Sequence, residues 1–434
     1  MFARSRLSRK LTARGCVLLL LTAMAVLAGL GRDGILGATP GIRDFLRVPN
    51  DELDIAYGAY GFGFYPALVL GGTLVELAGT PLALLIAGSG VAAAICLCGL
   101  AWSLTVLVLS RLVLGLSTGI VVTATAAALA PWIPPRERGW AIGLVQAALA
   151  AGNLLIPLSD RAWFPGAWRG GFFVLAILTA LWVWACHRWF RPHPTETGHD
   201  PAATGPVYWR GALPVLLLPT CLALFQGWGM ALCREWVPRY LLETWHFDIK
   251  LSAVVTQTSA AAMVLGCLVG GLAADRSLVH SSNIRSAHQI VPGVGFLLAA
   301  LSLTLLPIGA DQLAIALWLG LALFGLQAVG TMLWVIAIDI GGRHTGISAG
   351  FVGLGLLLSQ LVSPLYLFGL SRSVPAILGV GMLMLASIMS FRLRPHIELP
   401  VRAPAPPVPD EPVDTAAAEI DALLTKSGKH EGRR

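Results

Sequence analysis

The sequence predicts an all-α integral membrane protein in which twelve transmembrane helices form two pseudo-symmetric six-helix bundles. Three observations lead to this fold class. Hydrophobic residues make up 56% of the 434 residues and charged residues only 12%, where a water-soluble domain carries about a quarter. Many uncharged segments reach the roughly 20 apolar residues that cross a bilayer. Two short patterns also recur in the two halves of the chain.

The apolar segments are expected to be helices, because residues 82–100, for example, are apolar nearly all round and lack the period-two alternation of barrel strands. They run over 15–38, 56–77, 81–101, 103–131, 139–159, 168–190, 211–233, 251–273, 287–308, 312–338, 345–369 and 374–392. Basic residues precede the first segment, as in a signal peptide. Its apolar run is longer than a secretory core, so we interpret it as an uncleaved signal-anchor helix.

Charged residues outside these segments predict the topology. More arginines fall in loops on the side of the N-terminus than in the opposite loops, which places both termini in the cytoplasm. The excess of arginine over lysine hints at a bacterium, so we expect a multi-pass protein of the bacterial cytoplasmic (inner) membrane. The predicted domains are a cytoplasmic N-terminus (1–14), an N-terminal six-helix bundle (15–190), a cytoplasmic linker (191–210), a C-terminal six-helix bundle (211–394) and a disordered cytoplasmic tail (395–434).

The recurring patterns indicate an internal duplication. Gly71-Gly72-x-x-x-Glu76 follows the second span, and Gly270-Gly271-x-x-x-Asp275-Arg276 follows the eighth, 199 residues later. Arg136-x-x-Gly139-x-x-x-Gly143 follows the fourth span, and Arg343-x-x-Gly346-x-x-x-Gly350 follows the tenth, 207 residues later. Because both pairs occupy equivalent places, they favour two parallel repeats of six spans, which is one plan of membrane transporters.

Composition disfavours several other function classes. The net charge of +7 is concentrated at the chain ends and in a few loops, so we expect no nucleic-acid partner. The histidines show no ligand spacing, and glycine-rich stretches lie inside apolar spans, where glycine serves close helix packing. We therefore expect no metal, no cofactor and no enzymatic activity.

These motifs resemble the major facilitator superfamily across residues 15–394. The repeated glycine motif is similar to that family's cytoplasmic signature, although Leu77 and Ala273 depart from it. The run Leu107-x-x-x-Arg111-x-x-x-Gly115 resembles its span-four motif. Trp132-Ile-Pro-Pro-Arg136-Glu137-Arg138-Gly139, followed by Trp168-Arg169-x-x-Phe172-Phe173, is typical of branches that carry organic anions.

Two branches of that family compete for the closer match. The organophosphate:phosphate antiporters share the stretch from Trp236 to Ser252, and the anion:cation symporters share an arginine eight residues before a proline, as Arg32 stands before Pro40. The symporters place an acid directly before that arginine and another in span four, where this chain has Gly31 and Thr118. The antiporters' second phosphate-binding arginine falls on Met230, and Arg234 stands four residues on.

The resemblance implies a secondary active transporter that moves a small organic anion, a carboxylate or an organophosphate, by alternating access. Its partners would be that anion, a coupling ion or counter-anion, and the lipid bilayer, and the protein would be monomeric. Two alternatives stay open: a drug or metabolite efflux transporter, and a membrane sensor with the same fold that does not transport.

Four charged residues are the principal candidates for substrate binding: Arg32 and Asp33 in span one, and Arg234 and Glu235 at span seven. Spans one and seven occupy equivalent places in the two halves, so their faces should meet at a central cavity. Two guanidinium groups there would anchor a carboxylate or phosphate, and the two acids would neutralise the empty site or take up protons. The alternative is that all four lie near the outer ends of their helices and extend to the membrane surface.

Neutral polar residues within the spans are further candidates for the substrate path, in particular Tyr57, Tyr60, Gln146, Asn153 and Gln226. Tyr65, Gln257 and Gln360 have similar positions. The alternative for the tyrosines is anchoring at the membrane interface, and for the amides it is bridging between helices.

A third set is expected to act in gating: Glu76, Arg111, Asp275, Arg276 and Arg343. An acid at the cytoplasmic face, such as Asp275, can cap the N-terminus of a neighbouring helix and hold one access state closed. The resemblance gives Arg111 a structural or proton-relaying role. The alternative for the loop residues is that they only set the topology.

Overall fold

The computed structural model describes residues 2–162, 168–191, 207, 209–247, 253–281, 284–308, 311–362 and 374–393. The predicted tail and residues 192–206 of the predicted linker lie outside the described residues. Within the described part of the chain, each of the twelve predicted spans coincides with a helix. The prediction of an all-α fold is therefore confirmed.

The first half of the chain forms six long helices. They are α1 (Phe2–Leu46), α2 (Asn50–Ala78), α3 (Thr80–Leu100), α4 (Leu104–Leu129), α5 (Arg138–Ala162) and α6 (Trp168–Trp189). Local chemistry sets several of their ends. Gly79, with φ of 79°, ends α2 in a conformation that favours glycine, and Pro81 follows in the first turn of α3. The hydroxyl of Ser103 caps α4 by accepting from the amide of Val106 at 3.4 Å.

The second half repeats this plan with one interruption. Its helices are α7 (Trp209–Ala231), α8 (Val237–Trp245), α9 (Ala253–Ser281), α10 (Ile284–Leu305), α11 (Gln312–Gly341), α12 (Thr345–Val362) and α13 (Val374–Ser390). A π-helical turn, η2 (Leu232–Trp236), joins α7 to α8, so these two helices make one continuous span. A short 3-10 turn, η5 (Gly342–His344), separates α11 from α12.

The outer faces of these helices suit a bilayer. Large apolar side chains such as Phe62, Leu77 and Trp102 are 69–82% exposed. Among the described residues, nine segments are long and apolar enough to cross a membrane, and one of them, Gln312–Val362, contains both α11 and α12. Exposed apolar surface on this scale would be unfavourable in water and is favourable in lipid.

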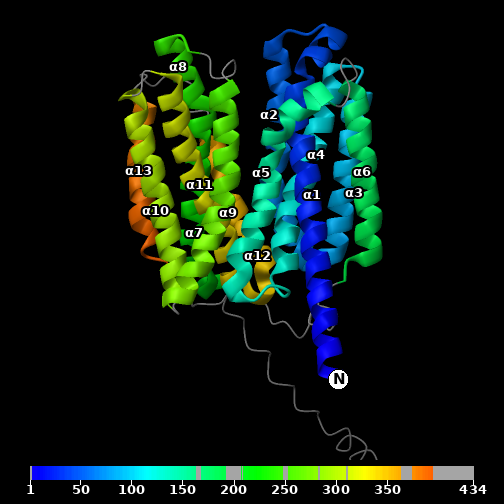
Figure 1. The fold of residues 1–434 in the computed structure, drawn as a ribbon, viewed down its shortest axis with the longest axis vertical. Helices are drawn as coiled ribbons and strands as arrows, with labels where there is room; N and C mark the ends of the chain where they lie inside the picture. Colours follow the sequence, from blue (N-terminus) through cyan, green and yellow to red (C-terminus); the bar gives the residue numbers. More distant parts are fainter. Residues whose placement is uncertain are drawn as a thin grey trace, which may run out of the picture.

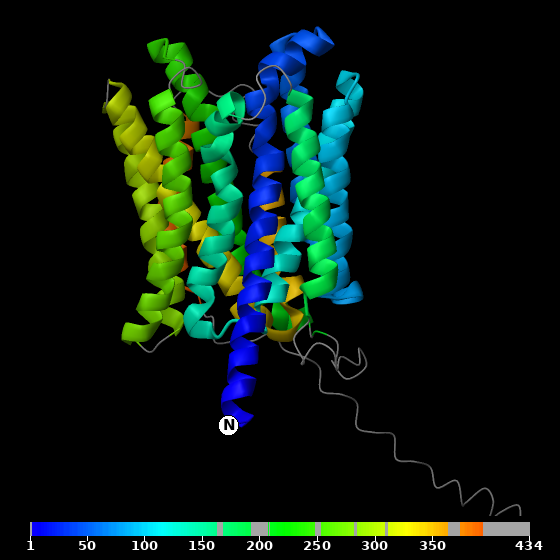
Figure 2. The same ribbon diagram turned by 45° about the vertical axis from the view of Figure 1, so that its right-hand side comes forward.

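The helices assemble into two groups that stand side by side (Figures 1 and 2). Helices α1–α6 form one bundle and α7–α13 the other. The two bundles meet at the end of the molecule where α1 begins, and their helices diverge toward the end where α8 lies (Figure 1). We call the first of these the closed end and the second the α8 end.

Glycines from the recurring patterns allow the bundles to meet at the closed end. A Cβ atom on Gly139 of α5 would collide with the carbonyl of Gly271 on α9, and the reverse also holds. Gly72 of α2 and Gly346 of α12 face each other in the same way. The glycine pair at the end of α2 or α9 therefore packs against the Arg-x-x-Gly pattern at the start of α12 or α5 in the opposite half. Only glycine lets the backbones approach this closely.

Candidate functional site

A cavity of about 200 Å³ lies between the two bundles. Its polar lining comes from helices of both halves and consists of Arg32, Tyr65, Gln146, Gln226, Arg234, Glu235, Gln327 and Gln360. Phe64, Met230, Met263 and Trp334 are among its apolar walls. The structure therefore brings the two arginines predicted for the site, which are far apart in the sequence, to one cavity.

Arg32 of α1 enters this cavity with Asp33 behind it. Its Nε and Nη2 donate to the two carboxylate oxygens of Asp33 at 2.8 and 2.7 Å, and Nη2 also lies 3.3 Å from the carbonyl oxygen of Leu149 on α5. Adjacent residues on a helix point about 100° apart, yet these two side chains still form a bidentate pair. Asp33 is only 6% exposed and is not part of the cavity lining.

Arg111 of α4 supports Arg32 through the backbone. Its Nη1 and Nη2 donate to the carbonyl oxygens of Gly31 and Arg32 at 2.9 and 2.7 Å, and its guanidinium lies 5.2 Å from the ring centre of Tyr60. The Arg111 side chain is buried and does not line the cavity. Its position therefore suits a residue that holds α1 in place more than one that touches a substrate.

Arg234 and Glu235 reach the cavity from the π-helical turn. Met230 at the end of α7 and Arg234 both line the cavity, so they share one face despite the change of helix type. Nη2 of Arg234 lies 3.8 Å from the sulfur of Met263. The side chains of Arg234 and Glu235 are both accessible from the cavity. Single π-helical turns inside α-helices occur frequently at functional sites, because they redirect side chains without ending the helix.

Four amides surround the charged groups. Gln146 and Gln226 were expected there from their positions, and Gln226 also donates to the carbonyl oxygen of Leu326 on α11 at 3.3 Å. Gln360 and Tyr65 had similar positions in their spans. Gln327 was not among the predicted site residues, although an amide within an apolar span is the same signal that identified the other three glutamines.

Other predicted site residues lie elsewhere or cannot be placed, and Gln257 is not part of the cavity lining. Tyr57 forms a short hydrogen bond with the hydroxyl of Thr39 and does not line the cavity. Tyr60 is buried against Arg111 outside the lining. The side chain of Asn153 lies outside the described residues.

Two acids join the bundles at the closed end in equivalent ways. The carboxylate of Asp275, on α9, accepts from the amides of Gly139 and Trp140 in the first turn of α5, both at 2.8 Å. Glu76, at the end of α2, lies 3.3 Å from the amide of Ile347 in the first turn of α12 and 3.2 Å from the imidazole of His344. Each acid thus caps a helix of the opposite bundle, where the helix dipole favours negative charge.

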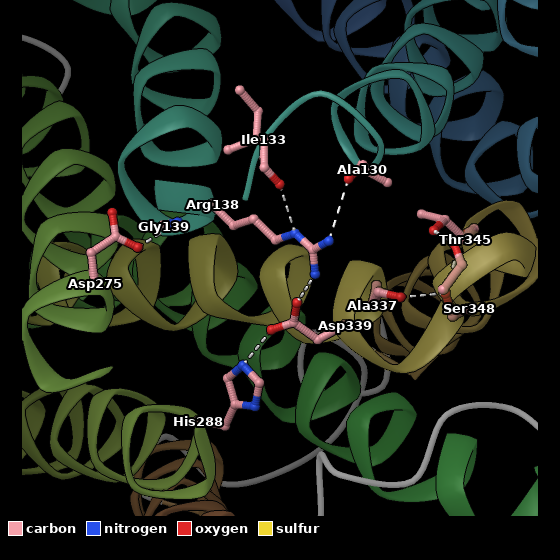
Figure 3. Close-up of polar contacts among 11 residues, drawn as sticks. Ala130, Ile133, Arg138, Gly139, Asp275, His288, Ala337, Asp339, Thr345 and Ser348 are labelled. Carbon is pink, nitrogen blue, oxygen red and sulfur yellow. Dashed lines mark hydrogen bonds and ion pairs between the residues drawn. The ribbon is translucent and has the colours of Figure 1, made fainter. Parts of the chain in front are cut away.

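A further ionic network joins the two bundles (Figure 3). Arg138, at the start of α5, forms an ion pair with Asp339 on α11, and it also donates to the carbonyl oxygens of Ile133 and Ala130 at 3.2 and 3.3 Å. Asp339 accepts from Nε2 of His288 on α10 at 2.7 Å. Asp339 and His288 were not predicted as site residues, and the sequence carries no local motif that links them.

The other predicted gating residues lie at the same end. Arg276 follows Asp275 on α9 and is exposed, and Arg343 is exposed in η5. The structure therefore places Glu76, Asp275, Arg276 and Arg343 together at the closed end and places Arg111 beside the cavity.

Known proteins resemble this chain along most of its length. The sequence model of the Major Facilitator Superfamily matches residues 21–364. A protein of Cupriavidus necator named as a probable sulfoacetate transporter is 27% identical over 405 residues, which cover 87% of this chain and 94% of that protein. The galacturonate transporter of Dickeya chrysanthemi is 23% identical over 281 residues, which cover 58% of this chain and 79% of that protein.

Solved structures share the fold. The human organic anion transporter MFSD10 (TETRAN) superposes with a TM-score of 0.69 at 16% identity, covering 87% of this chain and 99% of that one. The predicted fold class of two six-helix bundles is therefore confirmed.

Proposed function

Because the chain belongs to the major facilitator superfamily, we propose that it is a secondary active transporter that moves a small organic anion across the bacterial cytoplasmic membrane by alternating access. Membership of this family confirms the prediction of a transporter rather than an enzyme.

The single observation that carries the proposal is the pairing of Arg32 and Arg234 in one cavity. They come from the first helix of each bundle, so the cavity presents a cation from each half of the molecule. A guanidinium presents a planar fork of donors that matches carboxylate, sulfonate and phosphate oxygens. A charge within the membrane is costly unless a partner or an aqueous cavity compensates it, and an anionic substrate would supply such a partner.

The size and lining of the cavity support a small cargo. At about 200 Å³ it is smaller than the roughly 300–1,000 Å³ clefts that take drug-sized ligands. Gln146, Gln226, Gln327 and Gln360 can hydrogen-bond the remaining oxygens of a polar molecule. The names of the relatives, sulfoacetate and galacturonate transporters, point to the same class of cargo. Efflux of a large apolar compound is less consistent with this lining.

The contacts at the closed end support alternating access. The caps made by Asp275 and Glu76 and the pair of Arg138 with Asp339 join the two bundles on the side of the N-terminus. We place that side in the cytoplasm, because arginines are more frequent in its loops. On this assignment the structure is outward-facing, and the bundles must separate at the closed end to release the cargo inside.

The test is counterflow in liposomes that contain the purified protein. A panel of short carboxylates, sulfoacetate, uronates and organophosphates is exchanged against the labelled form of each compound. We expect saturable exchange of at least one anion, and we expect Arg32→Lys to abolish it while the folded yield is unchanged. Full activity of Arg32→Lys would contradict the binding role of this arginine. A protein that exchanges no anion would overturn the transporter proposal in favour of a sensor.

A further inference from the structure

The ionic network at the closed end contains a buried histidine. His288, on α10, is only 2% exposed, and its Nε2 lies 2.7 Å from the carboxylate of Asp339 on α11. The other ring nitrogen, Nδ1, is buried and makes no hydrogen bond with the described residues. This arrangement fits a neutral imidazole that carries its proton on Nε2, because a charged ring would bury an unpaired Nδ1–H group.

Asp339 is shared between the two bundles (Figure 3). Its Oδ1 pairs with Arg138 of the α1–α6 bundle, and its Oδ2 accepts from His288 of its own bundle. With a neutral imidazole the three groups sum to zero charge, because one guanidinium balances one carboxylate. Closure of the bundles therefore supplies the cation that Asp339 needs, and an additional proton would leave an excess positive charge in a largely buried site.

Other described groups around α10 do not supply a second cation. The helices packed against α10 are α9, α11 and α13. Asp339 is the only charged residue on α11, and α13 carries none. On α9, the charge of Asp275 acts on Asp339, but it is negative and its carboxylate already caps α5, while Arg276 is exposed. Within the described residues, His288 is thus the titratable group that stays in contact with Asp339 when Arg138 departs.

Opening of the closed end removes Arg138 from Asp339, since the two residues belong to different bundles. The carboxylate would then be left with a neutral histidine, which is unfavourable for a charge in a poorly hydrated site. A proton on Nδ1 of His288 restores neutrality, because it creates an imidazolium–carboxylate pair within one bundle. An imidazole changes its charge between about pH 5 and 8, so a proton is available to it in the cytoplasm.

We propose that His288 is a proton-binding site that fills when the closed end opens. This inference rests on the proposed alternating access. The proton comes from cytoplasmic water as the bundles part, forms an N–H bond on Nδ1, and returns to cytoplasmic water when Arg138 recovers Asp339. Because it enters and leaves on the same side, this proton does not cross the membrane with the cargo. Its effect is that acidification of the cytoplasm favours the inward-facing state.

A second histidine at the closed end acts in the opposite direction. Nδ1 of His344 lies 3.2 Å from the carboxylate of Glu76, which belongs to the other bundle. A proton on His344 would therefore strengthen a contact across the closed end and favour closure. The two histidines differ in sign, because Asp339 lies in the same bundle as His288. A test of His288 is therefore made in a His344→Gln background.

The experiment measures the distance between spin labels at Ile55 on α2 and Leu242 on α8, which are both exposed. The protein is free of native cysteines, carries His344→Gln, and is studied without cargo between about pH 6 and 8. A short distance at the α8 end reports the inward-facing state. We expect the ratio of inward-facing to outward-facing protein to rise as the pH falls, by up to about tenfold per pH unit for one proton.

Two further variants assign this dependence to one residue. His288→Gln should remove it, because the glutamine amide can still donate to Asp339 but does not titrate. His187→Gln is the matched control, because His187 is exposed on α6, and it should leave the dependence unchanged. Should His288→Gln fail to fold, Asp339→Asn takes its place, since without the carboxylate there is no charge for the proton to balance and the dependence should vanish.

The outcomes separate this proposal from the transporter proposal. A ratio that does not change with pH in the His344→Gln protein would overturn the role of His288 and leave the transporter proposal intact. The same pH dependence before and after His288→Gln would do so as well. Absence of any anion exchange in the counterflow assay would overturn the transporter proposal, whatever the pH dependence of the distances.

Discussion

The carboxylate of Asp275 holds the first turn of α5 through the amide of Gly139, 2.8 Å away, and so fastens one bundle to the other. Its counterpart Glu76 lies farther from the equivalent amide, that of Ile347, at 3.3 Å. The two caps are related by the internal duplication but are not equal in geometry. We therefore expect the bond from Asp275 to contribute more to closure than the bond from Glu76.

Asp275→Ala should weaken the closed end. Loss of an N-cap costs about 0.5–2 kcal/mol, which corresponds to a shift of about 2- to 30-fold in the equilibrium between access states. Spin labels at Ile55 and Leu242, both exposed and near the α8 end, would report this shift as a larger population with a short distance between the bundles. The labels require a background from which the seven native cysteines have been removed.

Asp275→Asn and Glu76→Ala serve as comparisons for this variant. Asparagine is also a good N-cap, so Asp275→Asn should shift the distances less than Asp275→Ala. Glu76→Ala should also shift them less, because its cap is longer. Equal shifts for Asp275→Ala and Glu76→Ala would contradict the expectation that the shorter hydrogen bond contributes more to closure.

Gly271→Val should prevent the approach of α9 to α5. Its side chain would enter the space of the Gly139 carbonyl, and overpacking of this kind costs about 1–3 kcal/mol. Because the strain exists only when the closed end is closed, we expect transport to fall at least tenfold while thermal stability changes little. Gly171→Val on α6 is the matched control, since a Cβ atom there has open space, and it should transport at the wild-type rate.

Arg138, Asp339 and His288 should behave as one unit in stability. Removing one member of a largely buried ionic group leaves the others without compensation and costs about 3–5 kcal/mol. We expect Arg138→Gln and Asp339→Asn each to lower the thermal unfolding temperature in detergent. The double variant should lose less than the sum of the two single losses. Additive losses would show that the ion pair drawn in Figure 3 does not couple these residues.

Arg32→Lys and Arg234→Lys should discriminate between substrates by charge. Loss of a charge-assisted hydrogen bond costs about 1.5–3 kcal/mol, or about 10- to 150-fold in Kd. A dianion that engages both arginines should lose affinity in either variant, whereas a monoanion should be sensitive to only one of them. Titration of both variants with sulfoacetate and with acetate tests this. If Arg234→Lys leaves the Kd of every anion unchanged, Arg234 is not part of the binding site.

Much of this fold follows from local sequence signals. Apolar segments of membrane length predicted each long helix but not the short α8, and the recurring glycine motifs predicted the duplication. The sequence also suggested that Asp275, an acid at the predicted cytoplasmic face, can cap the N-terminus of a neighbouring helix, because the helix dipole favours negative charge there. Several helices are longer than the predicted spans. For example, α1 runs from Phe2 to Leu46, whereas its predicted span covered residues 15–38. Helical hydrogen bonding does not stop where apolar residues stop.

The contacts between distant helices were less accessible from sequence. Arg138 and Asp339 are 201 residues apart, and no spacing rule joins them. Asp339 is a single acid at the end of an apolar span, where it has the same appearance as a charge that only sets topology. Tyr57 and Tyr60 show the converse, because a position within a span does not reveal which face of a helix meets the cavity. Which way a side chain points depends on packing between helices that the chain brings together only on folding.

The crosswise packing of the glycine motifs has a consequence for how the two halves can change. Gly72 packs against Gly346, and Gly139 packs against Gly271. We call these two contacts the glycine joints, and each half of the chain contributes one surface to both of them. This is the rule of a two-fold dimer, in which patch A of one subunit binds patch B of the other and the reverse. A half-chain joined to a second copy of itself would reproduce both joints. A larger residue at any of these four glycines therefore strains a contact with the opposite half, and no side-chain change there can relieve the strain, because the atoms it meets belong to the backbone of another glycine.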